Sequence, residues 1–188
     1  MQAVNRWLWY VCVLMILLSD LRAQDARAAN EAGVESQIKA AYLYKFGRFI
    51  EWPPATFARP GSTVRIGILG ADPVADDLSR IVVNRTINDL PVTVLKMRRD
   101  DQPADFHMIF ISNQEAGRLG EILAAVRGQP ILIITESNES FSAGSMINLV
   151  TIDGKLRFDV ALNAVEAGHL KLSALMLAAA NRVVRGSS

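Results

Sequence analysis

The sequence has few of the residues that most often bind metals or form covalent links. Its 188 residues include two histidines, His107 and His169, and one cysteine, Cys12. Neither histidine has the short spacing to a second histidine or to a cysteine that zinc sites use. A lone cysteine cannot form an internal disulfide bond. We therefore expect no metal ion and no other cofactor, and we expect His107 to lie in the core with a hydrogen-bonded nitrogen.

Neither sign of charge is in excess. The chain has 20 Lys and Arg residues against 19 Asp and Glu residues, a formal net charge of +1. Loss of residues 1–28 would remove three arginines and two aspartates and leave 17 basic and 17 acidic residues. A chain without net charge has no general electrostatic attraction for nucleic acid or for an anionic membrane. We therefore expect no nucleic acid partner.

Long apolar runs are also missing. The longest covers residues 7–18, and its 12 residues suit the core of a signal peptide rather than a membrane span of about 20 residues. Ala26-Arg27-Ala28 then supplies the small-x-small pattern of a cleavage site. We expect a signal peptide over residues 1–28 that is cleaved after Ala28, with cleavage after Ala23 as the alternative. The protein would then be exported without inserting into the membrane.

The motifs of common enzymes are absent. Gly67-Ile68-Leu69-Gly70 matches neither the dinucleotide-binding fingerprint nor a P-loop. Ser36-Gln37-Ile38-Lys39 matches Ser-x-x-Lys, but the companion motifs Ser-Asp-Asn and Lys-Thr-Gly do not follow. These absences favour a binding protein over an enzyme, and an enzyme of unrecognised type stays open.

What the sequence contains is an alternation of apolar strands and amphipathic helices. Helical spacing of apolar residues predicts a helix over residues 38–52, which Pro53 ends. Nearly continuous apolar runs predict buried strands over residues 64–69, 106–111 and 130–135. Residues 90–95 are also strand-like, and Pro91 favours an edge position for them. This alternation is typical of an α/β fold with a single doubly wound, mostly parallel sheet and helices on both faces. We expect one domain over residues 35–185.

Short polar signals predict where two helices begin. Asp72 is expected to be the N-cap of a helix that has Pro73 in its first turn. Ser112-Asn113-Gln114-Glu115 has the form of a capping box and predicts a helix directly after the strand at 106–111.

The last third of the chain changes pattern. Asp153-Gly154 lies between strand-like runs at 146–152 and 155–162 and predicts a C-terminal antiparallel hairpin. In the second run, Lys155, Arg157 and Asp159 alternate with apolar residues and predict one exposed face. The apolar segment from Ser173 to Val183 predicts a final helix packed deep in the core.

Six segments carry a resemblance to a known family. They lie at residues 39–53, 66–70, 107–112, 141–147, 156–160 and 168–173, and the most specific is the Phe-x-x-Trp-Pro that ends at Pro53. In order and spacing these segments resemble the YfiR family of bacterial periplasmic proteins. They cover nearly all of the chain that follows the expected signal peptide.

The resemblance implies a function and partners. Such a protein would be a non-catalytic α/β regulator that binds the periplasmic sensor region of an inner-membrane diguanylate cyclase and holds the cyclase inactive. An outer-membrane OmpA-like lipoprotein could sequester the regulator, and a homodimer is expected. The output would be a lower level of cyclic di-GMP and less biofilm.

This chain departs from the family pattern at three places. The family's paired cysteines are missing, which puts redox control in doubt. The expected Gly-Gly-Met-Ile reads Gly144-Ser145-Met146-Ile147. The expected Ser-Ser-Lys reads Ser173-Ala174-Leu175, which removes a charge from a contact surface.

Two sets of candidate site residues follow. For partner binding we select Phe141, a large apolar residue in a polar loop, and the turn His169-Leu170-Lys171. The alternative for Phe141 is that its ring is covered by its own loop. A small-ligand-binding module is the other functional hypothesis. Its ligand would lie at the carboxyl ends of the strands, near Gly70, Asn113 and Ser137, where doubly wound sheets bind ligands.

Export can be tested directly. We expect N-terminal sequencing of the protein from a periplasmic fraction to begin at Ala29, because the signal peptidase recognises the small residues Ala26 and Ala28. Recovery of a mature chain that still contains residues 7–18 would contradict this prediction.

Overall fold

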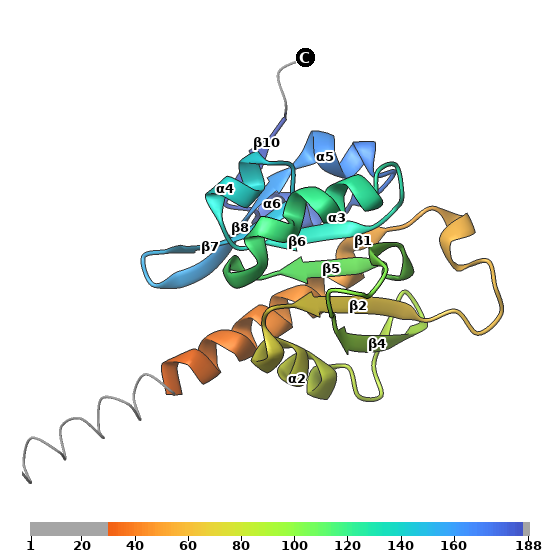
Figure 1. Ribbon diagram of the computed structural model, residues 1–188, viewed down its shortest axis with the longest axis horizontal. Coiled ribbons are helices and arrows are strands. Elements are labelled where there is room, and N and C mark those ends of the chain that lie inside the picture. The colour runs from red at the N-terminus through yellow and green to blue at the C-terminus, as the bar shows by residue number, and fades with distance from the viewer. Residues whose placement is uncertain (1–29, 186–188) are drawn as a thin grey trace, which may run out of the picture. The chain divides into compact units, whose positions relative to one another are not determined.

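An eight-stranded sheet is the centre of the computed structural model, which describes residues 30–185 (Figure 1). The expected cleavage after Ala28 lies outside the described residues. The strands of this sheet are β2 (Val64–Leu69), β3 (Thr86–Ile87), β4 (Leu90–Lys96), β5 (Met108–Ile111), β6 (Leu132–Thr135), β7 (Ile147–Ile152), β8 (Lys155–Ala161) and β10 (Arg182–Val184). Two further strands, β1 (Ile50–Glu51) and β9 (Lys171–Leu172), pair with each other. The helices are an N-terminal helix over residues 30–49, α2 (Asp72–Ile81), α3 (Leu119–Ala125), α4 (Asn138–Ser142), α5 (Leu162–Ala167) and α6 (Ala174–Ala179).

The strand order confirms the predicted fold class. The sheet runs β10-β8-β7-β6-β5-β2-β4-β3, and the strands from β4 to β7 in this order are parallel. The chain passes from β2 to β4 on one side and then returns to β5 on the other side. Parallel strands joined in this way form a doubly wound sheet whose switch point lies between β2 and β5.

Helices cover both faces of the sheet, as predicted. One apolar cluster joins the N-terminal helix and α2 to alternate strand residues such as Ile66, Phe110 and Ile134. A second cluster joins α3 to residues such as Ile109 and Ile133, whose side chains point to the other face. The central strands are therefore buried on both sides.

The predicted hairpin is confirmed. β7 and β8 pair antiparallel from Ile147↔Val160 to Ile152↔Lys155. Asp153 and Gly154 have φ values of 49° and 68°, which a type I′ turn requires at both central positions.

The predicted helix over 38–52 is too long at its C-terminal end. Helical structure stops at residue 49, and Ile50–Glu51 form β1, which pairs antiparallel with β9. Pro53 favours extended backbone in the residue before it, which is compatible with this exit from the helix. The partner strand lies about 120 residues later in the chain, so local periodicity could not show it.

The predicted final helix is wrong in length and in burial. α6 has six residues, and Leu175 is 72% exposed. Ala180 has extended backbone, and Val183 belongs to β10, which pairs parallel with β8. The C-terminal segment completes the sheet margin instead of extending a core helix.

Neither predicted helix cap forms a side-chain hydrogen bond to its helix. Asp72 is the first residue of α2, whose N-cap is Ala71 without a side-chain hydrogen bond. Ser112 is the N-cap residue of the helical turn that follows, as predicted, but its Oγ donates to the carbonyl oxygen of Gly70 at 2.9 Å and accepts no hydrogen bond from that turn. That turn is a 3-10 helix over Asn113–Arg118, and α3 begins only at Leu119.

Trp52 provides a test of the core. Its side chain is 8% exposed and its ring lies edge-on to Phe57 at 5.8 Å, as expected for a core residue. We expect Trp52→Ala to lower the free energy of unfolding by about 3–5 kcal/mol. Trp52→Phe should cost much less, because the indole nitrogen has no hydrogen-bond partner to lose. Urea melts measure both, and an unchanged midpoint for Trp52→Ala would show that this ring does not support the core.

Candidate functional site

The structure brings Gly70, Asn113 and Ser137 to one edge of the sheet. They follow β2, β5 and β6, which are neighbouring parallel strands. This edge lies at the switch point where doubly wound folds bind ligands. The topology therefore places the candidate crevice residues where the sequence predicted them.

Side chains of the protein itself occupy this edge. A Cβ atom at Gly70 would lie 2.5 Å from Ser112 Oγ and 2.7 Å from Glu115 Cγ, and Gly70 has a φ of 74°. The backbone N–H of Asn113 donates to Glu136 Oε1 at 2.9 Å, and Lys39 Nζ lies 2.6 Å from Glu136 Oε2. These polar groups are bonded to one another, which does not favour a ligand at this position.

Phe141 lies in α4 and is half-buried. The guanidinium carbon of Arg182 lies 5.6 Å from the centre of the Phe141 ring, in cation–π geometry. The ring is therefore neither covered by its own loop nor fully exposed. It forms a surface together with an arginine from β10.

The three residues of the turn at 169–171 differ in their exposure to solvent. His169, with a φ of 56°, and Lys171 are exposed, whereas Leu170 is 2% exposed and belongs to the core. This corrects the selection of Leu170 as a contact residue, because a core side chain is not available to a partner. Lys171 lies opposite Glu51 in the β1–β9 pair.

Sequence analysis missed the residue that organises the surface around Phe141. Asp159 was expected on the exposed face of β8, but its side chain is only 4% exposed. Its Oδ1 accepts from Asn181 Nδ2 at 2.7 Å, and its Oδ2 accepts from Arg182 Nε at 3.1 Å and Nη2 at 2.6 Å. Arg182 remains 55% exposed. We call Phe141, Asp159, Asn181 and Arg182 the Asp159 corner.

A buried polar group lies next to the Asp159 corner. Asn148 pairs with Asp159 across the β7–β8 hairpin and is fully buried. Its Oδ1 accepts from the Thr135 hydroxyl at 3.3 Å, and this hydroxyl lies 2.7 Å from that of Ser145. Asn148 Nδ2 has no hydrogen-bond partner. The group contains no histidine, cysteine or lysine to act as a base, so its chemistry suits binding and structural roles.

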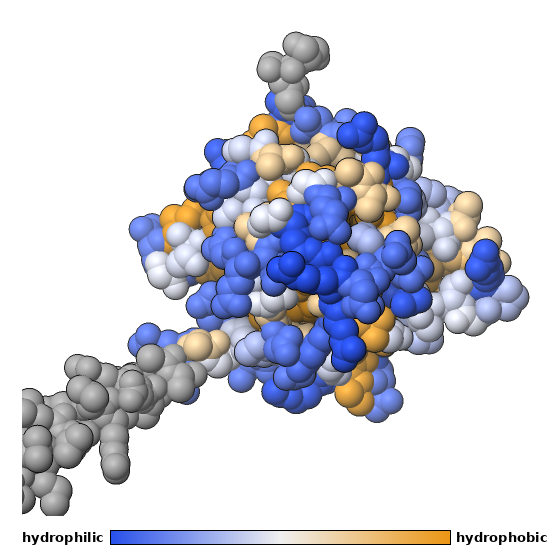
Figure 2. Space-filling model, in the orientation of Figure 1, coloured by the Kyte–Doolittle hydropathy of each residue, from blue (hydrophilic) through white to orange (hydrophobic). Residues whose placement is uncertain are grey.

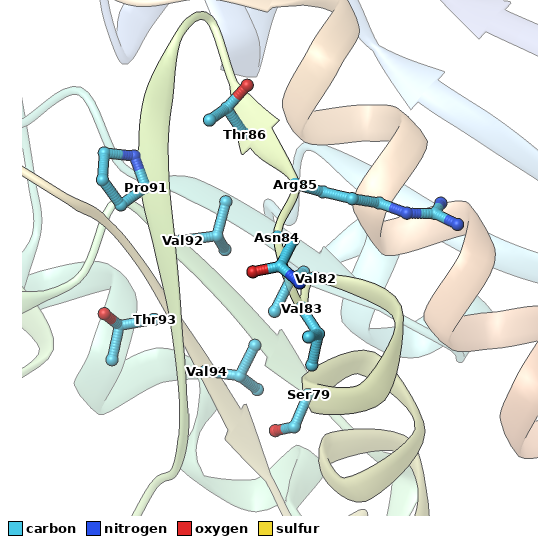
Figure 3. A pocket seen from close by; sticks show the side chains of 10 residues that line it. All are labelled: Ser79, Val82, Val83, Asn84, Arg85, Thr86, Pro91, Val92, Thr93 and Val94. Carbon is cyan, nitrogen blue, oxygen red and sulfur yellow. The ribbon is translucent and has the colours of Figure 1, made fainter.

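A cavity lies at the far margin of the sheet (Figure 3). It has a volume of about 710 Å³ between the end of α2 and the β3–β4 hairpin. Four valines and five polar residues are among those that line it. The one charged side chain, Arg85, extends away toward the N-terminal helix, where its guanidinium carbon lies 5.6 Å from the Tyr44 ring. Figure 2 shows an apolar patch over the turn after α2, in which Val83 is 63% exposed. Apart from Arg85, the lining of this cavity has no charged side chain.

His107 is bonded as predicted. Its Nδ1 accepts from the backbone N–H of Arg65 at 3.0 Å, and its ring stacks on Phe57 at 4.7 Å. Burial lowers the pKa of His107 below its ordinary value of 6.5, and the nearby Arg65 lowers it further. Among residues 30–185, no group of three His, Cys, Asp or Glu side chains could hold a metal ion. In the same part of the chain, no helix has the length and apolar character needed to cross a membrane.

The comparison with protein families identifies the chain as a member of the YfiR/HmsC-like family, whose model matches residues 36–181. The resemblance seen in the sequence is thereby confirmed. This family is regulatory rather than catalytic, and membership implies a periplasmic regulator of diguanylate cyclase signalling.

Comparisons with curated proteins and with solved structures give no further information on function. No curated protein matches the chain. Among solved structures, the chain is similar to an ABC domain in complex with L-Trp from Streptococcus pneumonia, with a TM-score of 0.46 and 10% identity. The similarity covers 64% of this chain and 55% of that chain. A likeness this remote carries no information on function.

The bonding of His107 predicts a pH dependence of stability. The unfolded chain takes up a proton at His107 near pH 6.5, whereas the folded protein does so only at lower pH. Between these values the unfolded state binds more protons, so the free energy of unfolding falls as the pH falls. His107→Asn retains a nearby acceptor and does not titrate.

Urea melts at about pH 5 and about pH 7.5, on either side of the ordinary histidine pKa, test this dependence. The wild-type protein should lose more free energy of unfolding than His107→Asn over this range. Equal losses would show that His107 does not titrate differently in the folded and unfolded states.

Proposed function

We propose that the protein is a non-catalytic periplasmic regulator that binds the periplasmic sensor region of an inner-membrane diguanylate cyclase and represses the enzyme. The result would be a lower level of cyclic di-GMP and less biofilm. Family membership carries this proposal, since it implies a regulator of this signalling system. The sequence contributes the expected signal peptide over residues 1–28.

The Asp159 corner supports a protein partner. Arginine and aromatic residues are over-represented among the side chains that dominate binding energies at protein interfaces. Here an exposed Arg182 lies against the half-buried ring of Phe141, and the buried Asp159 fixes its guanidinium group. A fixed arginine loses less side-chain entropy on binding than a free one. The side chains of the Asp159 corner would therefore need little reordering when a partner binds.

The family resemblance also suggests partners other than the cyclase. We propose an outer-membrane OmpA-like lipoprotein as a competitor that sequesters the regulator, and a homodimer as the oligomeric state. His169 and Lys171, which are both exposed, are the candidates for a second contact region.

A periplasmic ligand-binding module that feeds a membrane signalling protein is the second candidate function. The predicted crevice gives this second function little support, because the polar groups near Gly70 are bonded to one another. A different pocket supports ligand binding and is described in the next subsection.

A genetic experiment tests repression. Deletion of the gene should raise cyclic di-GMP and surface attachment, because the cyclase would lose its inhibitor. Phe141→Ala should have the same effect with normal export and an unchanged melting temperature, whereas Phe141→Tyr, which keeps the aromatic ring, should still repress. If deletion leaves cyclic di-GMP unchanged under several growth conditions, the repressor function is wrong.

Lys171 requires its own control. Lys171→Glu should also raise cyclic di-GMP, but it sets two acidic side chains opposite each other in the β1–β9 pair. Lys171→Gln removes the charge without this repulsion. Lys155→Glu makes the same charge reversal at an exposed residue of the hairpin and should still repress. Repression by both Lys171 variants at wild-type level would exclude this residue as a contact.

A further inference from the structure

A second pocket lies on the other side of β8 from the Asp159 corner. It has a volume of about 420 Å³ and lies between the N-terminal helix, β8 and α6. Phe158 lines it, whereas Asp159, the next residue of the strand, points to the opposite face of the sheet. The floors of the two sites therefore lie on opposite faces of β8, and Arg157, the residue before Phe158, belongs to the rim of the pocket.

The floor of this pocket is a fixed aromatic cluster. Tyr42, Phe46 and Phe158 meet edge-to-face, with ring centres 5.0 to 6.1 Å apart. The Tyr42 hydroxyl donates to the carbonyl oxygen of Leu156 at 3.0 Å, which holds its ring in place. Such a floor is already formed before a ligand arrives, so little ordering would be required on binding.

The rim of the pocket is cationic. Lys45, Arg48 and Arg157 line it, all three are exposed, and none forms an ion pair with another residue of the described chain. No aspartate or glutamate is among the lining residues. Three positive charges without a matching acid around an apolar floor are complementary to an anion that has an apolar body.

An exposed apolar side chain completes the wall. Leu175 on α6 is 72% exposed, although Met176 beside it is buried under the same pocket. A ligand body in the pocket would contact the Leu175 side chain and remove part of its surface from water.

We propose that this pocket binds a single-chain carboxylate amphiphile, such as a fatty-acid anion. The chain would contact Tyr42 and Phe49, which are only partly buried, because the rings of Phe46 and Phe158 beneath are 2% and 5% exposed. The carboxylate would bind Arg48 and Arg157, whose guanidinium groups suit bidentate contacts with carboxylates. An amino acid fits less well, because its ammonium group would meet three cations and no acid. The volume lies within the roughly 300–1,000 Å³ of small-molecule sites.

Calorimetry with the exported protein and dodecanoate, kept below its micelle concentration, tests this site. We expect saturable binding of one dodecanoate per chain and no binding of dodecyltrimethylammonium, which has the same tail and the opposite charge. The double variant Arg48→Glu/Arg157→Glu should weaken dodecanoate binding by about tenfold or more, since two attractive charges become repulsive. Leu175→Asp should also weaken binding.

Arg127→Glu is the matched control, because it reverses one exposed charge beyond the end of α3, away from this pocket. It should bind dodecanoate like the wild-type protein, and melting temperatures should show that all variants fold. Equal binding of the cationic amphiphile, or unchanged binding by the double variant, would overturn the proposal. So would association with phosphatidylglycerol vesicles through Arg48 and Arg157 without any binding of free dodecanoate, because the surface would then recognise a membrane.

Discussion

The packing of Phe46 against Phe158 joins the first helix of the described chain to its late hairpin. The two rings are buried and meet edge-to-face with centres 5.0 Å apart. Their contact fixes the N-terminal helix across β8, and the chain then leaves the helix into β1. β1 pairs with β9, and the backbone N–H of Ser173 donates to the carbonyl oxygen of Phe49 at 3.0 Å. The positions of β9 and α6 thus depend on where this helix lies.

A second constraint holds the end of the chain. β10 has only three residues, and the buried Asp159 carboxylate binds the two side chains, Asn181 and Arg182, that bring it to β8. A buried carboxylate is costly unless charges and hydrogen bonds compensate it. Both carboxylate oxygens of Asp159 accept hydrogen bonds from Asn181 or Arg182, and these bonds compensate the free-energy cost of burying the charge. Asn181 and Arg182 also belong to the exposed Asp159 corner. The same contact therefore completes the sheet and presents Arg182 at the surface.

The sequence predicted those parts of the structure that depend on local chemistry. The Asp153-Gly154 turn and the central strands follow from turn residues and apolar runs, and they define the fold class. β1 and β10 could not be predicted, because each becomes a strand only through a partner distant in the chain. The alternation of polar and apolar residues in β8 predicted an exposed Asp159. This pattern does not show that Asn181 and Arg182, from a later part of the chain, cover the Asp159 side chain. Leu170 failed as a contact residue for a related reason: neighbouring residues in a turn can differ completely in burial.

The proposed repression places a physical demand on the surface of the protein. To hold a receptor about 99% inactive when it would otherwise be about 99% active, a repressor must prefer the inactive state by about 10⁴-fold, or about 5.5 kcal/mol. Such a preference requires an interface of roughly 1,200–2,000 Å² in which a few anchoring side chains dominate. Residues 29–188 have 17 basic and 17 acidic residues and no net charge for long-range attraction, so affinity must come from local contacts. A side chain fixed before binding, as Asp159 fixes Arg182 against Phe141, loses little entropy when a partner arrives. For this reason the sheet margin at β8 and β10 meets the demand better than the crevice at the switch point, where polar groups are already bonded to one another.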